Sequence, residues 1–243
     1  MIIPVFSSKG GVGKTTIAVN LSYNIASRNK KTLLIDTDPQ NGVASTLCVD
    51  YKEGLGEVLS EKIPIEHAIK EIRKNFFILP TGEFAVENEN KFTELFDVDN
   101  TKHLIEFLRN SLNFEIIVFD TAPGYTVRTS TLIRIGDILL AVFESEPASF
   151  ASFKVFEEYM FKKEILEKLY IILNRLRPSE VSEDFAFVFR YEARGNIIAY
   201  LPYDESVIFA TGNCLTVKEY KPDSPFTVIM DELVDKLLIH LNE

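Results

Sequence analysis

A glycine-rich loop near the start of the chain constrains its fold more than any other feature. Residues 7–16 read Ser-Ser-Lys-Gly-Gly-Val-Gly-Lys-Thr-Thr, between a predicted buried strand, Met1–Ser7, and a predicted helix, Thr15–Arg28. Glycines let the backbone amides curl around an anion, and the start of the helix turns its positive end to the same point. The segment therefore predicts a phosphate-binding loop, in which Lys14 contacts the β- and γ-phosphates and the Thr15 hydroxyl binds Mg²⁺.

The loop departs from the usual Gly-x-x-x-x-Gly-Lys-Ser/Thr pattern, because Ser8 replaces the first glycine and Lys9 adds a second lysine. Lys-Gly-Gly-Val-Gly-Lys-Thr-Thr resembles the deviant Walker A motif of the ParA/MinD family of ATPases, and the likeness is weakest over residues 43–113. In that family the extra lysine reaches across a dimer interface to the partner's phosphates; the alternative for Lys9 is a solvated lysine beside a loop. The resemblance implies catalytic roles for Lys9 and Lys14 and nucleotide contacts from Lys9, Gly10, Gly11, Val12, Gly13, Lys14, Thr15 and Thr16.

A second predicted strand, Lys31–Asp36, runs into Asp-Thr-Asp-Pro-Gln at residues 36–40. Alternate strand residues point to the same side, and open α/β sheets bind ligands at the carboxyl ends of their strands, so both carboxylates are expected to face the phosphates. The segment resembles the family's Asp-x-Asp-Pro-Gln motif, which implies that Asp38 orients or deprotonates the attacking water and that Asp36 helps hold the Mg²⁺ shell. The order Asn41-Gly42 inverts the family's Gly-Asn, and a solvated acidic turn is the alternative.

The apolar segment Phe114–Asp120 predicts another buried strand that ends in an aspartate. A strand of this kind opposite a phosphate-binding loop has the form of a Walker B segment, in which Asp120 holds a water on Mg²⁺ or ligates the metal from its outer shell. Asp-Thr-Ala-Pro-Gly at residues 120–124 resembles the family's Asp-x-x-Pro-Gly segment, whose backbone approaches the γ-phosphate. A strand followed by an ordinary turn is the alternative.

Two later strand ends complete the expected nucleotide site. The predicted strand Leu169–Arg175 carries Asn174 near its end, and the predicted strand Asn196–Leu201 is followed by Pro202 and, two residues later, Asp204. An asparagine amide presents a donor and an acceptor together, which suits the edge of a base. The resemblance implies that Asn174 bonds the adenine edge and that Pro202 and Asp204 close over the base, while a polar strand end is the alternative for Asn174.

Charge and cysteine content limit the other classes of function. A net charge of −10 and an isoelectric point of about 5.0 exclude a general attraction to nucleic acid or anionic lipid, so such binding needs a local patch. Cys48 and Cys214 lie far apart without metal-ligand spacing, which predicts two reduced, buried thiols. Four arginines are candidates for a DNA-binding face, although interleaved acidic residues favour a mixed, solvated surface. They are Arg175, Arg177, Arg190 and Arg194.

Predicted strands and helices alternate with no run of consecutive strands, which predicts an α/β fold: a mostly parallel, twisted β-sheet with helices on both faces, in a single domain over residues 1–243. No segment is apolar and long enough to span a membrane, and a cytoplasmic protein is expected. The middle of the chain is the hardest part to interpret. The other expected elements are helices at 55–59, 64–72, 101–112, 150–168 and 226–241, strands at 76–80 and 137–143, and an acidic loop or short helix at 87–99.

The resemblance implies an ATPase that uses ATP and Mg²⁺. As a ParA-like protein, the chain would form a homodimer with ATP, segregate or position plasmid or chromosomal DNA, and be reset by slow hydrolysis that a small ParB-like partner stimulates. A MinD-like ATPase that positions division or other machinery is the alternative, although no basic amphipathic tail follows the last predicted helix. A metal-handling relative would need cysteine ligands that this sequence does not supply.

Overall fold

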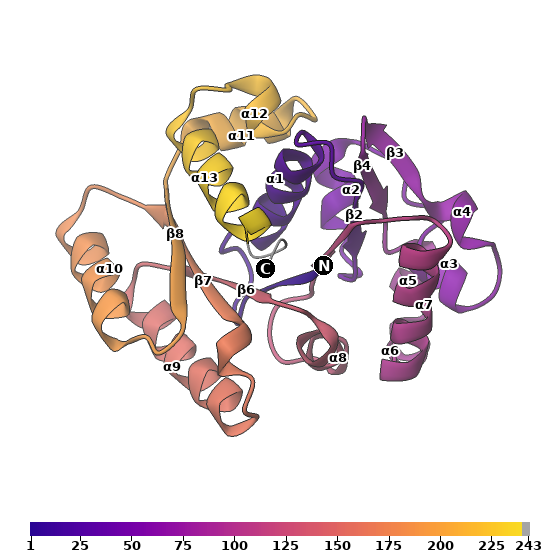
Figure 1. The fold of residues 1–243 in the computed structure, drawn as a ribbon, viewed down its shortest axis with the longest axis horizontal. Helices are drawn as coiled ribbons and strands as arrows, with labels where there is room; N and C mark the ends of the chain where they lie inside the picture. Colours follow the sequence, from indigo (N-terminus) through magenta and orange to yellow (C-terminus); the bar gives the residue numbers. More distant parts are fainter. Residues whose placement is uncertain (240–243) are drawn as a thin grey trace.

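The computed structural model describes residues 1–239, and the eight strands in that part of the chain form one sheet (Figure 1). Neighbouring strands run parallel except for the antiparallel pair at one edge. This confirms the predicted mostly parallel α/β fold. In spatial order the strands are β3 (Lys70–Arg73), β4 (Phe76–Leu79), β2 (Thr32–Asp36), β5 (Ile116–Asp120), β1 (Ile2–Phe6), β6 (Leu139–Glu144), β7 (Leu169–Leu176) and β8 (Asn196–Pro202).

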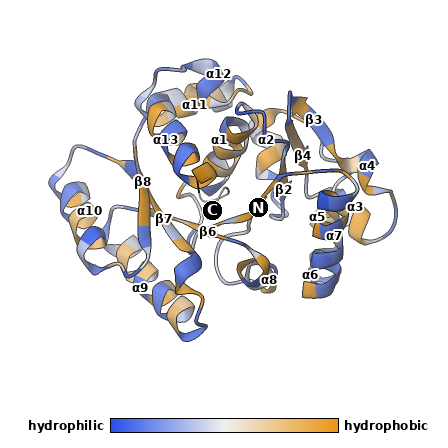
Figure 2. Cartoon of the chain, viewed as in Figure 1, coloured by the Kyte–Doolittle hydropathy of each residue, from blue (hydrophilic) through white to orange (hydrophobic). Residues whose placement is uncertain are grey.

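Helices cover both faces of the sheet, and each face has its own hydrophobic core. One core packs Val5 and Leu34 against α1, α2 and α11 to α13, whereas Phe6 and Ile35 point to the opposite face, which α3 to α10 cover. Figure 2 shows hydrophobic residues along the strands and hydrophilic ones along much of α7. The helices are α1 (Lys14–Ala26), α2 (Gly42–Leu47), α3 (Leu55–Leu59), α4 (Ile65–Ala68), α5 (Glu83–Glu87), α6 (Glu89–Leu95), α7 (Val98–Asn110), α8 (Val127–Ile135), α9 (Pro147–Lys162), α10 (Glu180–Glu192), α11 (Glu205–Gly212), α12 (Val217–Tyr220) and α13 (Pro225–Ile239).

Pro4 lies in the middle of the sheet, although proline lacks the N–H that a central strand normally donates. Its ring faces the β6 side, where a Cβ on Gly136 would come within 2.8 Å of the Pro4 Cδ atom. Pairing between β1 and β6 begins only at Val5. The missing donor therefore falls on a stretch of β1 that has no β6 partner, which allows proline here.

The prediction that no two strands follow each other directly was wrong at one edge of the sheet. The segment expected to be a helix over residues 64–72 instead divides into α4 and β3, and β3 pairs antiparallel with β4. Asn75 makes the tight turn possible because it adopts a left-handed conformation, with φ of 63°. The charged residues of β3 suit an edge strand but hide the period-two pattern that identifies buried strands.

The prediction of two reduced, buried thiols was also wrong. Cys48 and Cys214 form a disulfide with a Cα–Cα distance of 5.5 Å across 166 residues of sequence, and Cys48 is exposed. Cys48 ends α2 and Cys214 follows α11, two helices on the same face of the sheet. Sequence spacing carries no information about a pair that only tertiary packing brings together.

Helices α2, α5, α8, α10, α11 and α12 were not expected from the sequence. The acidic segment at residues 87–99 is helical over most of its length as α6 and the start of α7. The last helix is described to Ile239, so its expected end at Leu241 lies outside the described residues.

Candidate functional site

The phosphate-binding loop joins the carboxyl end of β1 to the first residue of α1. Gly11 and Gly13 have φ of 81° and 92°, a left-handed backbone that favours glycine. At Gly13 there is a second constraint, since a Cβ would overlap the side-chain amide of Asn174. That amide donates to the main-chain oxygen of Val12 at 2.7 Å, so the predicted base-binding asparagine packs directly on the loop.

Lys14 and Thr15 both contact Asp120 at the end of β5. The Lys14 ammonium lies 3.0 Å from one oxygen of the Asp120 carboxylate, and the Thr15 hydroxyl donates to the other at 2.6 Å. Lys14 is 7% exposed and Asp120 is fully buried. The side chains predicted to bind phosphate and Mg²⁺ therefore meet at one point below the loop.

Asp36 and Asp120 are direct neighbours in the sheet, because β2 and β5 pair in the register that places them side by side. Burial and then the charge of Asp120 raise the pKa of the Asp36 carboxyl to about 8, despite hydrogen bonds from the amides of Val43 and Asp38. Burial also raises the pKa of Asp120, and the Lys14 charge opposes that rise. Both raised pKa values mean that this pair of carboxyl groups favours a bound proton, and a divalent cation beside them would favour their ionised forms instead.

Asp38 and Lys9 lie at the open side of the same site. Together with the loop glycines, Lys14 and Arg175 they line a hollow of about 310 Å³. The Asp38 carboxylate accepts a hydrogen bond from the Gln40 amide at 3.1 Å. The Lys9 side chain is exposed, and no acidic partner of its ammonium is found in the part of the chain that the structure describes.

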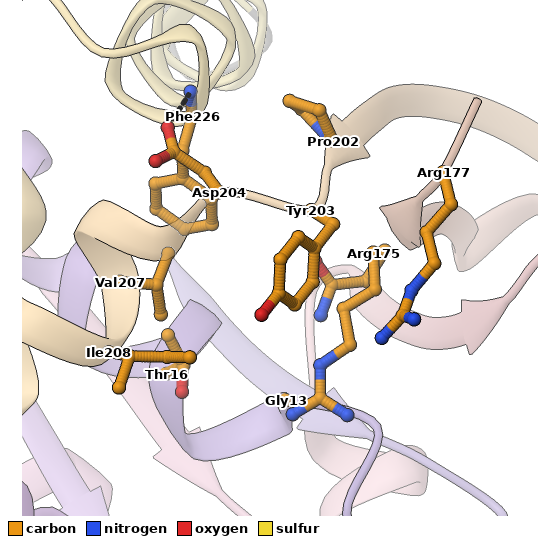
Figure 3. Close-up of a pocket in the computed structure, with 11 residues that line it drawn as sticks. Gly13, Thr16, Arg175, Arg177, Pro202, Tyr203, Asp204, Val207, Ile208 and Phe226 are labelled. Atoms are coloured by element: carbon orange, nitrogen blue, oxygen red, sulfur yellow. Dashed lines mark hydrogen bonds between the residues drawn. The ribbon is translucent and has the colours of Figure 1, made fainter.

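A second hollow of about 110 Å³ adjoins the loop on the side of β7 and β8 (Figure 3). Asn174, Pro202 and Asp204, predicted to surround the base, all line it. The Asp204 carboxylate, however, accepts hydrogen bonds from the amides of Ser206 at 2.8 Å and Phe226 at 3.3 Å. Burial raises the pKa of Asp204, but hydrogen bonds from the Ser206 hydroxyl, from these two amides and from the Ser224 hydroxyl outweigh it and leave the pKa lowered. Asp204 thus holds the starts of α11 and α13 in place beside the hollow.

Two arginines and a tyrosine line the site in ways that the sequence did not reveal. Arg175 adopts a left-handed backbone, with φ of 56°, and its guanidinium donates to the main-chain oxygen of Gly11 at 2.6 Å and to Glu144 at 3.0 Å. The Arg177 guanidinium lies over the ring of Tyr203 at 4.7 Å, and both face the smaller hollow (Figure 3). The sequence could have placed Arg175 and Arg177 near the site, since both come just after Asn174. It could not have identified the residues that they contact, Gly11, Glu144 and Tyr203.

The structure does not bring the four candidate DNA-binding arginines together. Arg175 and Arg177 lie at the carboxyl end of β7, beside the nucleotide site. Arg190 and Arg194 lie at the end of α10 and just before β8, at the amino ends of the strands, where Arg194 is 3.6 Å from Glu158. The expectation of one face formed by all four is therefore wrong.

The sheet order, the strand–loop–helix and the two aspartates at adjacent strand ends define the class of the protein: a P-loop ATPase with a deviant Walker A motif. The chain belongs to the AAA_31 family, described as an AAA domain, which matches residues 1–171, and within it to the ParA/MinD ATPases. In the part described, none of the helices is long and apolar enough to cross a membrane.

Named relatives and a solved structure agree with this assignment. An uncharacterised ATP-binding protein of Methanocaldococcus jannaschii is 29% identical over 235 residues, 93% of this chain and 83% of that protein. The chromosome partitioning protein ParA of Myxococcus xanthus is 30% identical over 151 residues, so the match covers 60% of this chain and 52% of that protein. The septum site-determining protein MinD of Pyrococcus horikoshii, solved with Mg-ADP, is 26% identical with a TM-score of 0.78, and the match covers 100% of this chain and 98% of that one.

ATP and Mg²⁺ are the cofactors of this family, and the residues present fit them. Loop amides and Lys14 suit a triphosphate, while the Thr15 hydroxyl and the carboxylates of Asp36 and Asp120 are the oxygen donors that Mg²⁺ prefers. Over residues 1–239, no group of three or more His, Cys, Asp or Glu side chains could hold a metal by itself. Mg²⁺ usually binds through one or two carboxylates together with phosphate oxygens, which agrees with this sparse set of ligands.

Proposed function

We propose that this protein is an ATP-dependent dimerisation switch of the ParA kind, which segregates or positions DNA and is reset by slow, Mg²⁺-dependent hydrolysis. The observation that carries the proposal is the exposed Lys9 side chain at the open side of the phosphate hollow. Lys14 already supplies the charge beneath the loop, so a second lysine on the open side is placed to meet the phosphates of another subunit docked on this edge.

The other side chains divide the work of binding and hydrolysis. Lys14 and the amides of residues 10–16 hold the phosphates, while Thr15, Asp36 and Asp120 surround Mg²⁺, which when bound neutralises phosphate charge. Asp38 orients or deprotonates the attacking water. Asn174 and Pro202 contact the base, and Asp204 supports the start of α11 beside it.

Charge explains why dimerisation would depend on the triphosphate. Each subunit carries a net charge of −10, so two subunits repel each other when they meet at the phosphate edge. A Lys9 ammonium from each side, set against the partner's phosphates, offsets that repulsion. Hydrolysis removes the γ-phosphate contact and releases the dimer.

The test is light scattering of the Asp38→Ala protein, in which hydrolysis is blocked, with ATP and with ADP. We expect a dimer with ATP alone, which is lost when Lys9→Ala is added while ATP still binds the monomer. Lys163→Ala is the matched control, because it removes one exposed lysine at the end of α9, away from the site. A dimer that persists without Lys9, or that forms equally well with ADP, would refute this role for Lys9.

A MinD-like positioning role is the second candidate, and two observations favour it: the whole-chain match to MinD and the separation of the four arginines. The ATP-bound Asp38→Ala protein should be mixed with duplex DNA and, separately, with anionic vesicles. Salt-dependent DNA binding supports partition, and vesicle binding supports the MinD-like role.

The ParA-like proposal also includes a small ParB-like activator, a cytoplasmic location and a single ATPase domain over residues 1–243. The continuous sheet supports the single domain.

A further inference from the structure

The loop that carries Asp38 is held by a second loop, which the family motifs do not include. Thr81, at the end of β4, is fully buried. Its hydroxyl lies 3.0 Å from the main-chain oxygen of Asp36 and 2.8 Å from that of Asp38, so one donated hydrogen is shared between the two carbonyls. Thr81 thus fixes the backbone on both sides of Thr37, in the turn that presents Asp38.

Asn41 makes the other half of this connection. It is 2% exposed and adopts a left-handed backbone, with φ of 51°. Its side-chain oxygen accepts hydrogen bonds from the amides of Thr81 at 3.1 Å and Gly82 at 3.3 Å. The inverted order Asn41-Gly42 therefore has a structural reason, because Asn41 reaches the Thr81 loop while Gly42 lies where a Cβ would be 3.3 Å from the Thr15 side chain.

The supporting loop is in turn anchored from α3. The buried Glu57 carboxylate accepts hydrogen bonds from the amides of Gly54 at 3.0 Å and Phe84 at 2.6 Å, and a Cβ on Gly82 would overlap it. Contacts run without a gap from α3 through the Thr81 loop to Asp38. This support comes from the middle of the chain, where motifs are absent.

We propose that Thr81 and Asn41 are positioning residues for ATP hydrolysis, which act through the main chain of Asp38. The inference rests on the proposed function of Asp38 and goes beyond it by naming what holds Asp38 in place. Neither residue lines the phosphate hollow, so neither is expected to contribute to nucleotide affinity. Small displacements of a catalytic group lower turnover much more than they lower binding.

The test compares Thr81→Val, which keeps the shape but removes the donor, with Thr81→Ser, which keeps the donor. We expect Thr81→Val to lower kcat roughly ten- to hundredfold with an ATP Kd within about twofold of wild type, and Thr81→Ser to restore most of the turnover. Asn41→Gly, which retains the left-handed backbone, should likewise lower kcat with little change in the ATP Kd. This variant replaces Thr81→Val in the test if the valine variant does not fold.

Full kcat in both Thr81→Val and Asn41→Gly would overturn the positioning role alone. Equal losses of kcat and affinity in the valine and serine variants would also overturn it, since they would indicate a general structural defect. A wild-type protein that binds ATP without hydrolysing it would instead refute the proposed function together with this inference.

The disulfide supports a second, independent inference, because it joins the two sides of the nucleotide site. Helix α2, which Cys48 follows directly, begins four residues after Asp38, and its Val43 amide donates to Asp36 at 3.0 Å. Helix α11, which precedes Cys214, carries Val207 of the base hollow. The cross-link therefore connects the segment at the phosphate end to the segment at the base end.

The bond is open to chemical exchange, because Cys48 is exposed and Cys214 half-buried. A thiolate of a dithiol reductant can attack one sulfur, form a mixed disulfide and release the other cysteine as a thiolate. The second thiol of the reductant then displaces the first cysteine and leaves as the oxidised reductant. Both cysteines take up protons and end as thiols, so two electrons and two protons are transferred.

The geometry points to a thiol–disulfide site whose state is coupled to nucleotide binding. The bridged form holds α2 and α11 in a fixed relation, whereas the reduced form lets them move independently. A nucleotide that contacts both segments should bind the bridged form more tightly. By linkage, the bound nucleotide must then make the disulfide harder to reduce by the same factor.

The experiment measures the Kd of Mg-ADP for oxidised protein, reduced protein and the Cys48→Ser/Cys214→Ser variant. We expect binding roughly fivefold weaker, or more, in the latter two, and an equal factor when the thiol–disulfide equilibrium is measured in dithiothreitol buffers with and without Mg-ADP. Equal Kd values, or two free thiols in protein kept from reductant, would overturn the inference. Absence of Mg-ADP binding in every form would refute the nucleotide site itself.

Discussion

Reduction of the Cys48–Cys214 disulfide should make the protein much easier to unfold. The bond closes a loop of 166 residues. For a loop of that length the chain-entropy relation gives a loss of about 17 cal/mol/K in the unfolded state, or about 5 kcal/mol at 25 °C. A domain of this kind typically has a free energy of unfolding of about 5–15 kcal/mol, so the cross-link would account for a large share of it.

The assay is urea denaturation of wild-type protein with and without dithiothreitol, followed by circular dichroism. The reductant should move the midpoint to lower urea concentration by an amount equivalent to about 5 kcal/mol or somewhat less, because real unfolded chains retain structure. The Cys48→Ser/Cys214→Ser variant is the matched control. It should unfold near the reduced wild type, and its midpoint should not respond to reductant.

Coincident midpoints for oxidised and reduced wild-type protein would refute this reasoning, provided that thiol titration shows the bond present before reduction and absent after it. That result would mean that the unfolded chain gains no freedom when the long loop opens. A midpoint shift that also occurs in the double serine variant would mean that dithiothreitol acts on something other than this bond.

Three further predictions concern the nucleotide site. Lys14→Ala should weaken ATP binding roughly 100-fold by calorimetry, because it removes a charged donor from the phosphates, and unchanged affinity would contradict the assignment. Asp38→Ala should lower kcat roughly 100-fold with nearly unchanged ATP affinity, whereas normal turnover would reduce Asp38 to a turn residue. The nucleotide-free protein should lose stability as pH rises from about 4 towards about 8, since the pKa of Asp36 is raised in the folded state to about 8 and the unfolded chain releases that proton first. Urea midpoints across this range should fall less steeply for Asp36→Asn, and equal slopes would count against the raised pKa.

The parts of the site that could be predicted from sequence are the residues that a short local pattern identifies. Lys14 follows its glycines directly, and Asp36 and Asp120 each close an apolar run, so their placement at one sheet edge followed from the rule for parallel strands. Arg175 could not be found in this way, because its contact with the Gly11 carbonyl depends on a left-handed backbone at the end of β7. The disulfide depends likewise on α2 and α11 lying on one face of the sheet.

The middle of the chain, which carries no recognisable motif, supports the part of the site where hydrolysis would occur. Binding of phosphate requires a loop whose own residues make the contacts, so it leaves a local pattern in the sequence. Placement of Asp38 depends instead on Thr81, a residue 43 positions later whose hydroxyl is bonded to main-chain oxygens. Every residue carries a main-chain oxygen, whatever its side chain, and therefore the residues around Asp38 do not indicate that Thr81 is their partner. Thr81 belongs to the loop that Glu57 anchors to α3, so hydrogen bonds connect α3 to the segment that carries Asp38. If Asp38 has the role proposed for it, a change in this support should therefore alter the rate of hydrolysis more than the affinity for nucleotide.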